Sequence, residues 1–382
     1  MESEENLMTK KRLTAAVICK DEIQVIERFL HNFIDCVDEM IIVDTGSTDG
    51  TLEFLLDFVR TNKKYGQKMR IAKTKWNNNF AEARNTAFSL ATGDYVMWLD
   101  CDDIINDETR NFLRFFNKYA EEHPDVTCFE MKYLLGRDAN GMETWSMNRE
   151  RIVKNFMTYT WVGNIHEYLV VQSPNVQTKT MLIDQKYFIE HAKIKEHGSR
   201  NLDIFESMKK NNIAFTIRDK VYYGNELYDN GKYDEAYNYI VKLLKESKDQ
   251  IWYGDQISLY TKLFYMKKNT DYDLAISWLF EAMRVSSVEP RADILYFIGE
   301  YKKSKGFLND AIFWFKAAYN YDHGSRNDIF DKSYNKLNPA LELMTIYWQL
   351  DDYETSKMWH LRSKEAAPNN PVVLGNEKWF KH

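Results

Sequence analysis

The chain has few cysteines, and none of them lie close together in the sequence. Cys19, Cys36, Cys101 and Cys128 are widely spaced along 382 residues. This spacing excludes a zinc knuckle and a disulfide framework, and it favours a reducing compartment.

The sequence also lacks a long apolar run. The first twelve residues, MESEENLMTKKR, are polar where a signal peptide would need an apolar centre. No run approaches the ~20 apolar residues of a membrane helix. We therefore expect a cytoplasmic protein without a membrane span, and we expect residues 1–12 to be a flexible N-terminus.

An excess of basic residues is absent as well. Lys and Arg number 51 against 57 Asp and Glu, which gives a net charge of −6. A surface that follows a phosphate backbone is not expected from this balance, so nucleic acid is excluded as a partner. The length of the chain indicates two or three domains.

The most informative segment is Thr92–Ile105, TGDYVMWLDCDDII. Tyr95–Leu99 is an apolar run typical of a strand buried on both faces. It ends in Asp100, Asp102 and Asp103, three carboxylates that repel one another unless a cation lies between them. In an open α/β sheet, ligands bind beyond the carboxyl ends of the strands. The alternative is a solvated acidic turn.

The preceding residues predict a parallel α/β unit. Leu13–Cys19 and Met40–Val43 are apolar strands, and the helical pattern of Ile23–Ile34 lies between them. Met69–Ala72 predicts a third strand, and Phe112–Tyr119 a later helix. Asp44 follows the second strand, where side chains face the ligand crevice.

Four motifs in this region resemble one known family. They are Lys20-Asp21-Glu22, Asp44-Thr45-Gly46-Ser47-Thr48-Asp49, Ala83-Arg84-Asn85 and Asp100-Cys101-Asp102. In this order they are similar to the inverting family-2 glycosyltransferases with a GT-A nucleotide-sugar-binding fold. The resemblance implies an α/β domain over residues 13–198, with a mixed, mostly parallel sheet and flanking helices.

The resemblance also implies roles for individual residues. Asp44 would hold the nucleotide base, Arg84 would contact base or phosphate, and Asp100 would reach the ribose or sugar. Asp102 would bind a divalent metal, magnesium or manganese, on the diphosphate of a UDP-sugar. The other residues of these motifs assigned to donor binding are Lys20, Asp21, Glu22 and Asn85.

Two later histidines extend this site. GT-A enzymes often add a late histidine to the metal, and we assign His191 this role because imidazole suits a borderline metal such as manganese. His166-Glu167 is similar to a His-Glu pair in a subset of the family. An inverting transfer needs a base for the acceptor's proton. The candidates are Glu167, Asp103 and His166, and we favour Glu167 because Trp161 and Tyr168 would desolvate it.

Helical periodicity replaces the strand pattern from about residue 200. Ala236, Ala275, Ala311 and Ser356 lie 39, 36 and 45 residues apart, each after a turn. The pattern resembles tetratricopeptide repeats, which implies an all-α domain over residues 199–382. Stacked repeats form a concave face that commonly binds peptides, and repeat arrays often pair, so a homodimer is an open alternative.

These features lead to one expected function and two alternatives. A family-2 domain followed by such repeats is similar to the enzymes that glycosylate bacteriocin precursors. The expected reaction moves a hexose from a UDP-sugar to a Cys or Ser/Thr side chain of a peptide. One alternative acceptor is a surface polysaccharide or lipid-linked glycan, and the other alternative is a non-enzymatic repeat scaffold whose transferase domain has decayed.

Overall fold

The computed structural model describes residues 12–138, 141–155, 159–171, 176–194, 198–285, 290–322 and 330–380. The chain divides into two compact units, residues 1–135 with 147–197 and residues 136–146 with 198–382. Apart from Arg12, the predicted flexible N-terminus lies outside the described residues. The domain limits 13–198 and 199–382 stay a proposal.

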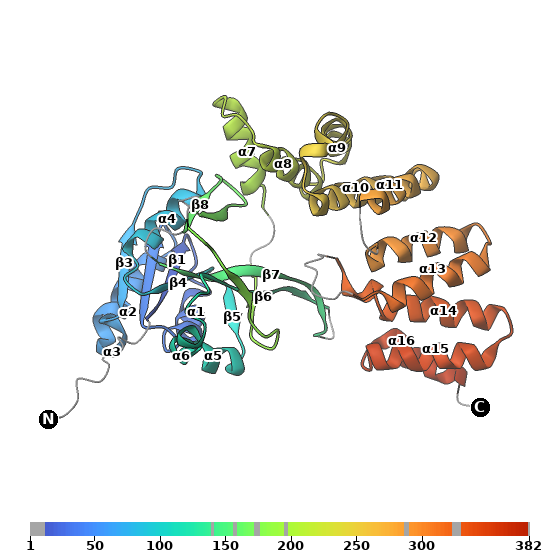
Figure 1. Ribbon diagram of the computed structural model, residues 1–382, viewed down its shortest axis with the longest axis horizontal. Coiled ribbons are helices and arrows are strands. Elements are labelled where there is room, and N and C mark those ends of the chain that lie inside the picture. Colours follow the sequence, from blue (N-terminus) through green and yellow to red (C-terminus); the bar gives the residue numbers. More distant parts are fainter. Residues whose placement is uncertain are drawn as a thin grey trace. The chain divides into compact units, whose positions relative to one another are not determined.

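A mixed sheet organises the first unit (Figure 1). Within the described ranges its strands follow the order β3-β2-β1-β4-β7-β6-β11-β5, and β10 pairs with β6. The strands are β1 Leu13–Cys19, β2 Glu39–Asp44, β3 Met69–Lys73, β4 Tyr95–Leu99, β5 Asp103–Ile105, β6 Cys128–Arg137, β7 Glu143–Lys154, β10 Thr180–Leu182 and β11 Phe188–His191. A separate hairpin joins β8 Tyr159–Val162 to β9 Tyr168–Val171.

Parallel pairing brings the predicted ligand-binding loops to one edge of this sheet. β1 lies between β2 and β4 and is parallel to both. The carboxyl ends of these three strands therefore point the same way, and the loops after Cys19, Asp44 and Leu99 are neighbours. The predicted strands over 13–19 and 95–99 are confirmed with these bounds.

Alternation along β1 gives the sheet two apolar faces. Ala15 and Val17 face a large core closed by α1 Ile26–Phe33, α2 Thr51–Thr61 and two later helices, whereas Ala16 packs under α4 Phe80–Leu90. α4 thus covers the opposite face of the sheet from α1 and α2. A short helix, α3 Lys63–Gly66, precedes β3.

The single helix expected over Phe112–Tyr119 is wrong in its limits. The chain forms α5 Asp107–Arg114 and α6 Phe116–Glu122, with a break at Phe115. The first of these begins earlier because the side chain of Asn106 accepts the backbone N–H of Thr109 at 2.8 Å and caps it. The apolar spacing of the sequence did not reveal this cap.

The second unit contains antiparallel helix pairs (Figure 1). Its helices are α7 Arg200–Lys210, α8 Ile217–Asp229, α9 Tyr233–Ser247, α10 Tyr253–Lys267, α11 Tyr272–Val285, α12 Ala292–Ser304, α13 Leu308–Asn320, α14 Leu337–Gln349, α15 Tyr353–Ala366 and α16 Pro371–Asn376. Four successive pairs run from α8–α9 to α14–α15. The predicted repeat positions Ala236, Ala275, Ala311 and Ser356 are all fully buried.

Close approach within a pair depends on small residues. A Cβ added to Gly299 of α12 would lie 2.8 Å from the ring of Phe315 on α13. Glycine therefore lets these two helices pack at this distance. The helices of this unit, like all others in the described ranges, are too short or too polar to cross a bilayer.

Lysine and carboxylate side chains join successive repeats along their first helices. Lys262 of α10 contacts Asp229 of α8 at 2.7 Å, and Lys268 contacts Glu300 of α12 at 3.1 Å. Lys303 of α12 contacts Glu342 of α14 at 2.6 Å. Such partly exposed pairs each contribute about 0–1 kcal/mol, so buried apolar packing carries most of the stability.

Candidate functional site

The carboxylate of Asp44 organises the loop that follows β2. Its Oδ1 accepts the backbone N–H groups of Gly46 at 3.0 Å and Ser47 at 3.1 Å. Its Oδ2 accepts the thiol of Cys19 at 3.7 Å, and the residue is only 2% exposed. Asp44 therefore stabilises the loop that follows β2, and its contact with the nucleotide base stays a prediction.

The loops after β1 and β2 are tied together through Asp21. Its backbone is left-handed, with φ of 55°. Its Oδ1 accepts the backbone N–H of Thr48 at 2.6 Å, and its own N–H donates to Ser47 at 2.9 Å. The N–H of Glu22 donates to Thr51 at 2.8 Å, while Lys20 is exposed. Asp21 and Glu22 therefore connect the loop after β1 to the loop after β2. The direct contact of these two residues with a donor stays a prediction.

The acidic segment after β4 separates its three carboxylates. Asp100 and Asp102 are partly exposed, whereas the side chain of Asp103 is fully buried. Asp103 accepts Tyr133 Oη at 2.9 Å on Oδ1, and the backbone N–H of Asp100 at 3.0 Å on Oδ2. A carboxylate committed in this way is not positioned to take a proton from an acceptor. The structure argues against Asp103 as the base.

Strand pairing brings His191 to this acidic segment. β11 runs antiparallel to β5, and His191 is opposite Asp103. Nδ1 of His191 lies 3.2 Å from Oδ1 of Asp102 and 2.8 Å from the hydroxyl of Tyr133. Burial by itself would lower the pKa of His191, because it disfavours the charged ring. Hydrogen bonds to Asp102 and Asp103 have the larger effect, and together they raise this pKa to about 10.

The donor set fits a divalent cation. Asp100, Asp103 and His191 each offer a ligand atom within 4.8 Å of the others. Asp103 is closed off from solvent, whereas the side chains of Asp100, Asp102 and His191 are partly exposed. Carboxylate oxygens and one imidazole nitrogen suit manganese, and carboxylates alone suit magnesium. The assignment of Asp102 and His191 as ligands stays a prediction.

Arg84 of α4 bridges two carboxylates from distant parts of the chain. Its Nη2 contacts Asp100 at 2.9 Å and its Nε contacts Glu167 at 2.6 Å. Its guanidinium lies over the rings of Trp98 at 4.7 Å and Trp161 at 5.1 Å. Nη1 is buried and has no hydrogen-bond partner among the described residues. The contact of Arg84 with the base or phosphate of a donor stays a prediction.

The charges of two arginines control the ionisation of Asp100. Burial alone would raise the pKa of this carboxyl, but Arg84 and Arg151 hold it at about 2. The same environment raises the pKa of Arg84 further, because the charges of Asp100 and Glu167 outweigh its burial. Asp100 is therefore anionic at neutral pH.

Two candidates for the base remain in the loop between β8 and β9. Glu167 is held beside Asp100 through Arg84, and its side chain is 11% exposed. It has a guanidinium partner in addition to the aromatic surroundings expected from Trp161 and Tyr168. His166 has a left-handed backbone with φ of 50°, which sets the direction of the chain just before Glu167. Glu167 stays our preferred base.

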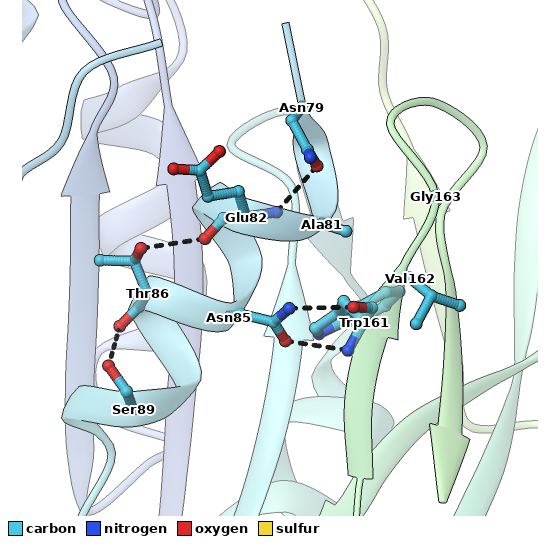
Figure 2. Close-up of a pocket in the computed structure, with 9 residues that line it drawn as sticks. All are labelled: Asn79, Ala81, Glu82, Asn85, Thr86, Ser89, Trp161, Val162 and Gly163. Atoms are coloured by element: carbon cyan, nitrogen blue, oxygen red, sulfur yellow. Dashed lines mark hydrogen bonds between the residues drawn. The ribbon is translucent and has the colours of Figure 1, made fainter. Parts of the chain in front are cut away.

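The side chain of Asn85, a residue expected to bind the donor, holds the β8–β9 hairpin. Its Nδ2 donates to the carbonyl of Trp161 at 2.9 Å, and its Oδ1 accepts the N–H of Trp161 at 2.8 Å and the hydroxyl of Thr160 at 3.1 Å (Figure 2). The side-chain amide is thus committed to the edge of β8. Asn85 therefore anchors β8 on α4 next to Arg84, and its contact with a donor stays a prediction.

A pocket of about 580 Å³ lies over this anchor, away from the acidic segment. It is lined by Asn79, Ala81, Glu82, Asn85, Thr86, Ser89, Trp161, Val162 and Gly163 (Figure 2). Hydrogen bonds within α4 occupy Thr86 and Ser89, and Asn79 caps the helix. We place the chemistry at the carboxylates after β4, because this pocket contains only one ionisable side chain, Glu82.

Sequence reasoning missed Arg151 and Tyr133. Arg151 of β7 is fully buried, and its Nη1 contacts Asp103 at 3.3 Å and the carbonyl of Trp98 at 3.2 Å. Its guanidinium lies 3.6 Å from the ring of Trp98 and 4.0 Å from that of Tyr133. The sequence around Arg151 did not reveal these partners, because they come from three other strands, β4, β5 and β6.

We expect Arg151→Leu to lower the free energy of unfolding by about 3–5 kcal/mol, because it leaves a buried carboxylate without its counter-charge. Urea denaturation measures this loss. The double variant Arg151→Leu/Asp103→Asn should recover part of it. Arg60→Leu removes an exposed arginine paired with Asp57 and should cost less than about 1 kcal/mol. A loss as small as that control would contradict a structural role for the buried pair.

A second prediction concerns pH. The folded-state pKa of His191, about 10, lies above its ordinary value of 6.5. The charged form is favoured by folding, so its contribution is complete below pH 6.5 and is lost as the pH rises to 10. With a chelator present, the difference in unfolding free energy between the unchanged protein and His191→Gln should shrink over this range. A difference that stays constant from pH 6 to 10 would contradict the assignment.

Comparison with known protein families gives a match to the segment that forms most of the first unit. Residues 14–171 match the model of the family described as "Glycosyl transferase family 2". This part of the chain is therefore similar to family-2 glycosyltransferases, and its mixed sheet with flanking helices fits the GT-A arrangement. The helical repeats of the second unit follow it.

Three relatives extend this comparison. "SPbeta prophage-derived glycosyltransferase SunS" from Bacillus subtilis is 24% identical over 67% of this chain and 60% of its own length. A poly(ribitol-phosphate) beta-glucosyltransferase from Bacillus spizizenii is 34% identical over 26% of this chain and 15% of its own length. A TPR repeat-containing protein from Synechococcus elongatus is 33% identical over 24% of this chain and 21% of its own length. The chain therefore spans 60% or less of each relative.

Proposed function

We propose that the protein is a metal-assisted inverting glycosyltransferase that takes a hexose from a UDP-sugar. The supporting observation is the group at the carboxyl end of β4, where Asp102 lies 3.2 Å from His191 and Arg84 joins Asp100 to Glu167. Family-2 similarity over residues 14–171 supports the same reaction class.

The proposed chemistry is a single displacement. The sulfur or oxygen of the acceptor forms a bond to the anomeric carbon of the sugar, while the bond from that carbon to the nucleoside diphosphate breaks. A divalent ion would neutralise the charge that appears on the diphosphate. Asp102 and His191 would hold that ion, Nη1 of Arg84 would contact a phosphate oxygen, and Glu167 would take the acceptor's proton.

For the acceptor we propose the side chain of a Cys or Ser/Thr in a peptide, such as a bacteriocin precursor. The support is the helical repeat unit, because stacked helix pairs present a concave face suited to an extended chain. The similarity to SunS covers more of this chain than either of the other two matches. We further propose a homodimer, and a measurement of the oligomeric state in solution tests it.

A second acceptor class is a surface polysaccharide or lipid-linked glycan. The relative named poly(ribitol-phosphate) beta-glucosyltransferase favours it, although the match covers 26% of this chain. The third hypothesis, a scaffold with a decayed transferase domain, requires the loss of site residues. The close arrangement of Asp100, Asp102, Arg84 and His191 argues against that loss.

One experiment separates these hypotheses. The protein is incubated with UDP-glucose or UDP-N-acetylglucosamine and Mn²⁺, together with either a Cys- and Ser-bearing precursor peptide or poly(ribitol phosphate). Mass spectrometry then follows the sugar increment. A peptide adduct that a chelator abolishes supports the proposal, and a product on the polymer alone supports the glycan acceptor. No turnover of any donor, with no donor-induced rise in Tm, would leave the scaffold hypothesis.

A further inference from the structure

The candidate metal ligands Asp102 and His191 lie on two segments that meet through the main chain. The backbone N–H of Ala192, the residue after His191, donates to the carbonyl of Asp102 at 3.0 Å. His191 itself lies opposite Asp103 where β11 pairs with β5. The spacing of the two ligand side chains, 3.2 Å between Nδ1 of His191 and Oδ1 of Asp102, therefore depends on this junction.

Arg28 of α1 bridges the junction between these two segments. Its Nη2 donates to the carbonyl of Ala192 at 3.2 Å and to the carbonyl of Asp102 at 3.4 Å. A carbonyl oxygen has two lone pairs, so that of Asp102 accepts both Arg28 and the N–H of Ala192. One guanidinium thus joins the acidic segment after β4 to the end of β11, although these lie 74 and 164 residues away in the sequence.

Helix α1 is a rigid base for these contacts. The apolar residues of its inner face, which are Ile26, Phe29, Leu30 and Phe33, are fully buried. One turn after Arg28, the side chain of Asn32 accepts the backbone N–H of Ile105 at 3.4 Å. Side chains four residues apart lie on the same face of a helix. α1 therefore holds both ends of the segment from Asp102 to Ile105.

The contacts of Arg28 differ from those of the other two arginines near the acidic segment. Arg84 pairs with Asp100 and Arg151 pairs with Asp103, whereas the guanidinium of Arg28 contacts only main-chain carbonyls in the described ranges. A charged donor makes a hydrogen bond about twice as strong as a neutral one. Arg28 thus fixes the main chain on both sides of the junction and leaves the carboxylate of Asp102 without a guanidinium partner among the described residues.

We propose that Arg28 is a positioning residue that holds Asp102 and His191 at the spacing at which they share one divalent cation. This inference rests on the metal site of the proposed function and adds a residue that does not touch the ion. Hydrogen-bonded groups outside the ligands orient those ligands and sustain metal affinity. A junction that is formed before the ion arrives also lowers the free energy spent on ordering the two segments.

The first test measures ion binding without any sugar donor. Arg28→Met keeps an unbranched apolar stem and removes every N–H donor of the guanidinium. Mn²⁺ affinity, read from the electron paramagnetic resonance of the free ion, should fall about 10- to 100-fold. Arg28→Lys keeps a charged donor and should recover part of this loss. An unchanged affinity in a folded Arg28→Met protein would overturn the proposal.

The matched control is Arg110→Met. Arg110 of α5 also donates to a backbone carbonyl of α1, that of His31, at 3.1 Å. A general loss of stability would therefore affect both variants, and Tm without metal measures it. Only Arg28→Met should lose Mn²⁺ affinity. An equal loss of Mn²⁺ affinity in Arg110→Met would reduce Arg28 to a structural role and overturn the proposal.

The second test uses the unchanged protein, so it does not depend on whether a variant folds. Hydrogen exchange of the Ala192 amide is followed by nuclear magnetic resonance with and without Mg²⁺. We expect slow exchange already in the ion-free protein, because the junction is held in place from α1. Free exchange that becomes slow only when Mg²⁺ is added would show that the ion orders the junction, and it would overturn the inference.

The outcomes also separate this inference from the proposed function. A loss of Mn²⁺ affinity confined to Arg28→Met, in a protein that transfers no sugar, would preserve the inference while the proposed function failed. Metal-dependent transfer with unchanged Mn²⁺ affinity in Arg28→Met would preserve the function alone. No Mn²⁺ binding by the unchanged protein would overturn the inference together with metal assistance.

Discussion

Replacing Asp102 by asparagine is expected to lower donor turnover by about 10²–10⁴-fold, because a cation on the leaving diphosphate supplies several kcal/mol of charge stabilisation. Asparagine keeps the shape of the side chain, so the fold should persist. Its neutral amide removes the charge that lies 3.2 Å from His191. The release of UDP from a UDP-sugar, measured with and without Mn²⁺, checks this expectation.

The matched control for Asp102 is Asp57→Asn. Asp57 is 58% exposed on α2, where its partner is Arg60. Its loss should leave both the basal and the manganese-stimulated rates unchanged. If Asp102→Asn kept its stimulation by manganese, the cation would have to be held elsewhere, and the metal site after β4 would be wrong.

The second large effect concerns the base. Glu167→Gln should lower kcat for transfer by about 10²–10⁴-fold, which is the usual contribution of a positioned general base. The amide of glutamine keeps an oxygen for Nε of Arg84, which Glu167 contacts at 2.6 Å. The Kd of the UDP-sugar should therefore change little. Rapid-quench transfer assays, combined with calorimetric titration of UDP, separate the two effects.

Two further variants make the assignment of the base specific. His166→Asn should retain most of the transfer rate if Glu167 is the base, and an exposed glutamate on α2, changed in Glu53→Gln, should have no effect. A severe loss in His166→Asn with normal turnover in Glu167→Gln would move the base to the histidine. A weakened UDP affinity in Glu167→Gln would instead make the glutamate a support for Arg84.

Much of the catalytic edge could be predicted from short segments. Asp44 and Asp100 end apolar runs, and parallel pairing of β2 and β4 with β1 then brings their loops to one edge. His191 ends another such run, and the structure places it beside Asp102. These predictions were accessible because a buried strand and the polar residue that ends it are adjacent in the sequence.

Other assignments depended on contacts between distant segments. Asn85 has the type and spacing of a donor-binding residue, yet both ends of its amide are bound to Trp161, 76 residues away. Asp103 is indistinguishable from Asp102 in the sequence, but Arg151 and Tyr133 enclose it. A sequence motif does not reveal such contacts, because the contacting residues lie far apart in the sequence.

The sequence by itself determined the two architectures, the strand-end carboxylates and the repeat period, because burial imposes periods of two or 3.6 residues on neighbouring positions. Only the tertiary structure decided which carboxylate stays partly exposed, which one is closed off beside an arginine, and which side chains surround His191. These properties are set by the atoms that surround a side chain, and in this protein those atoms come from β5, β6, β7 and β11.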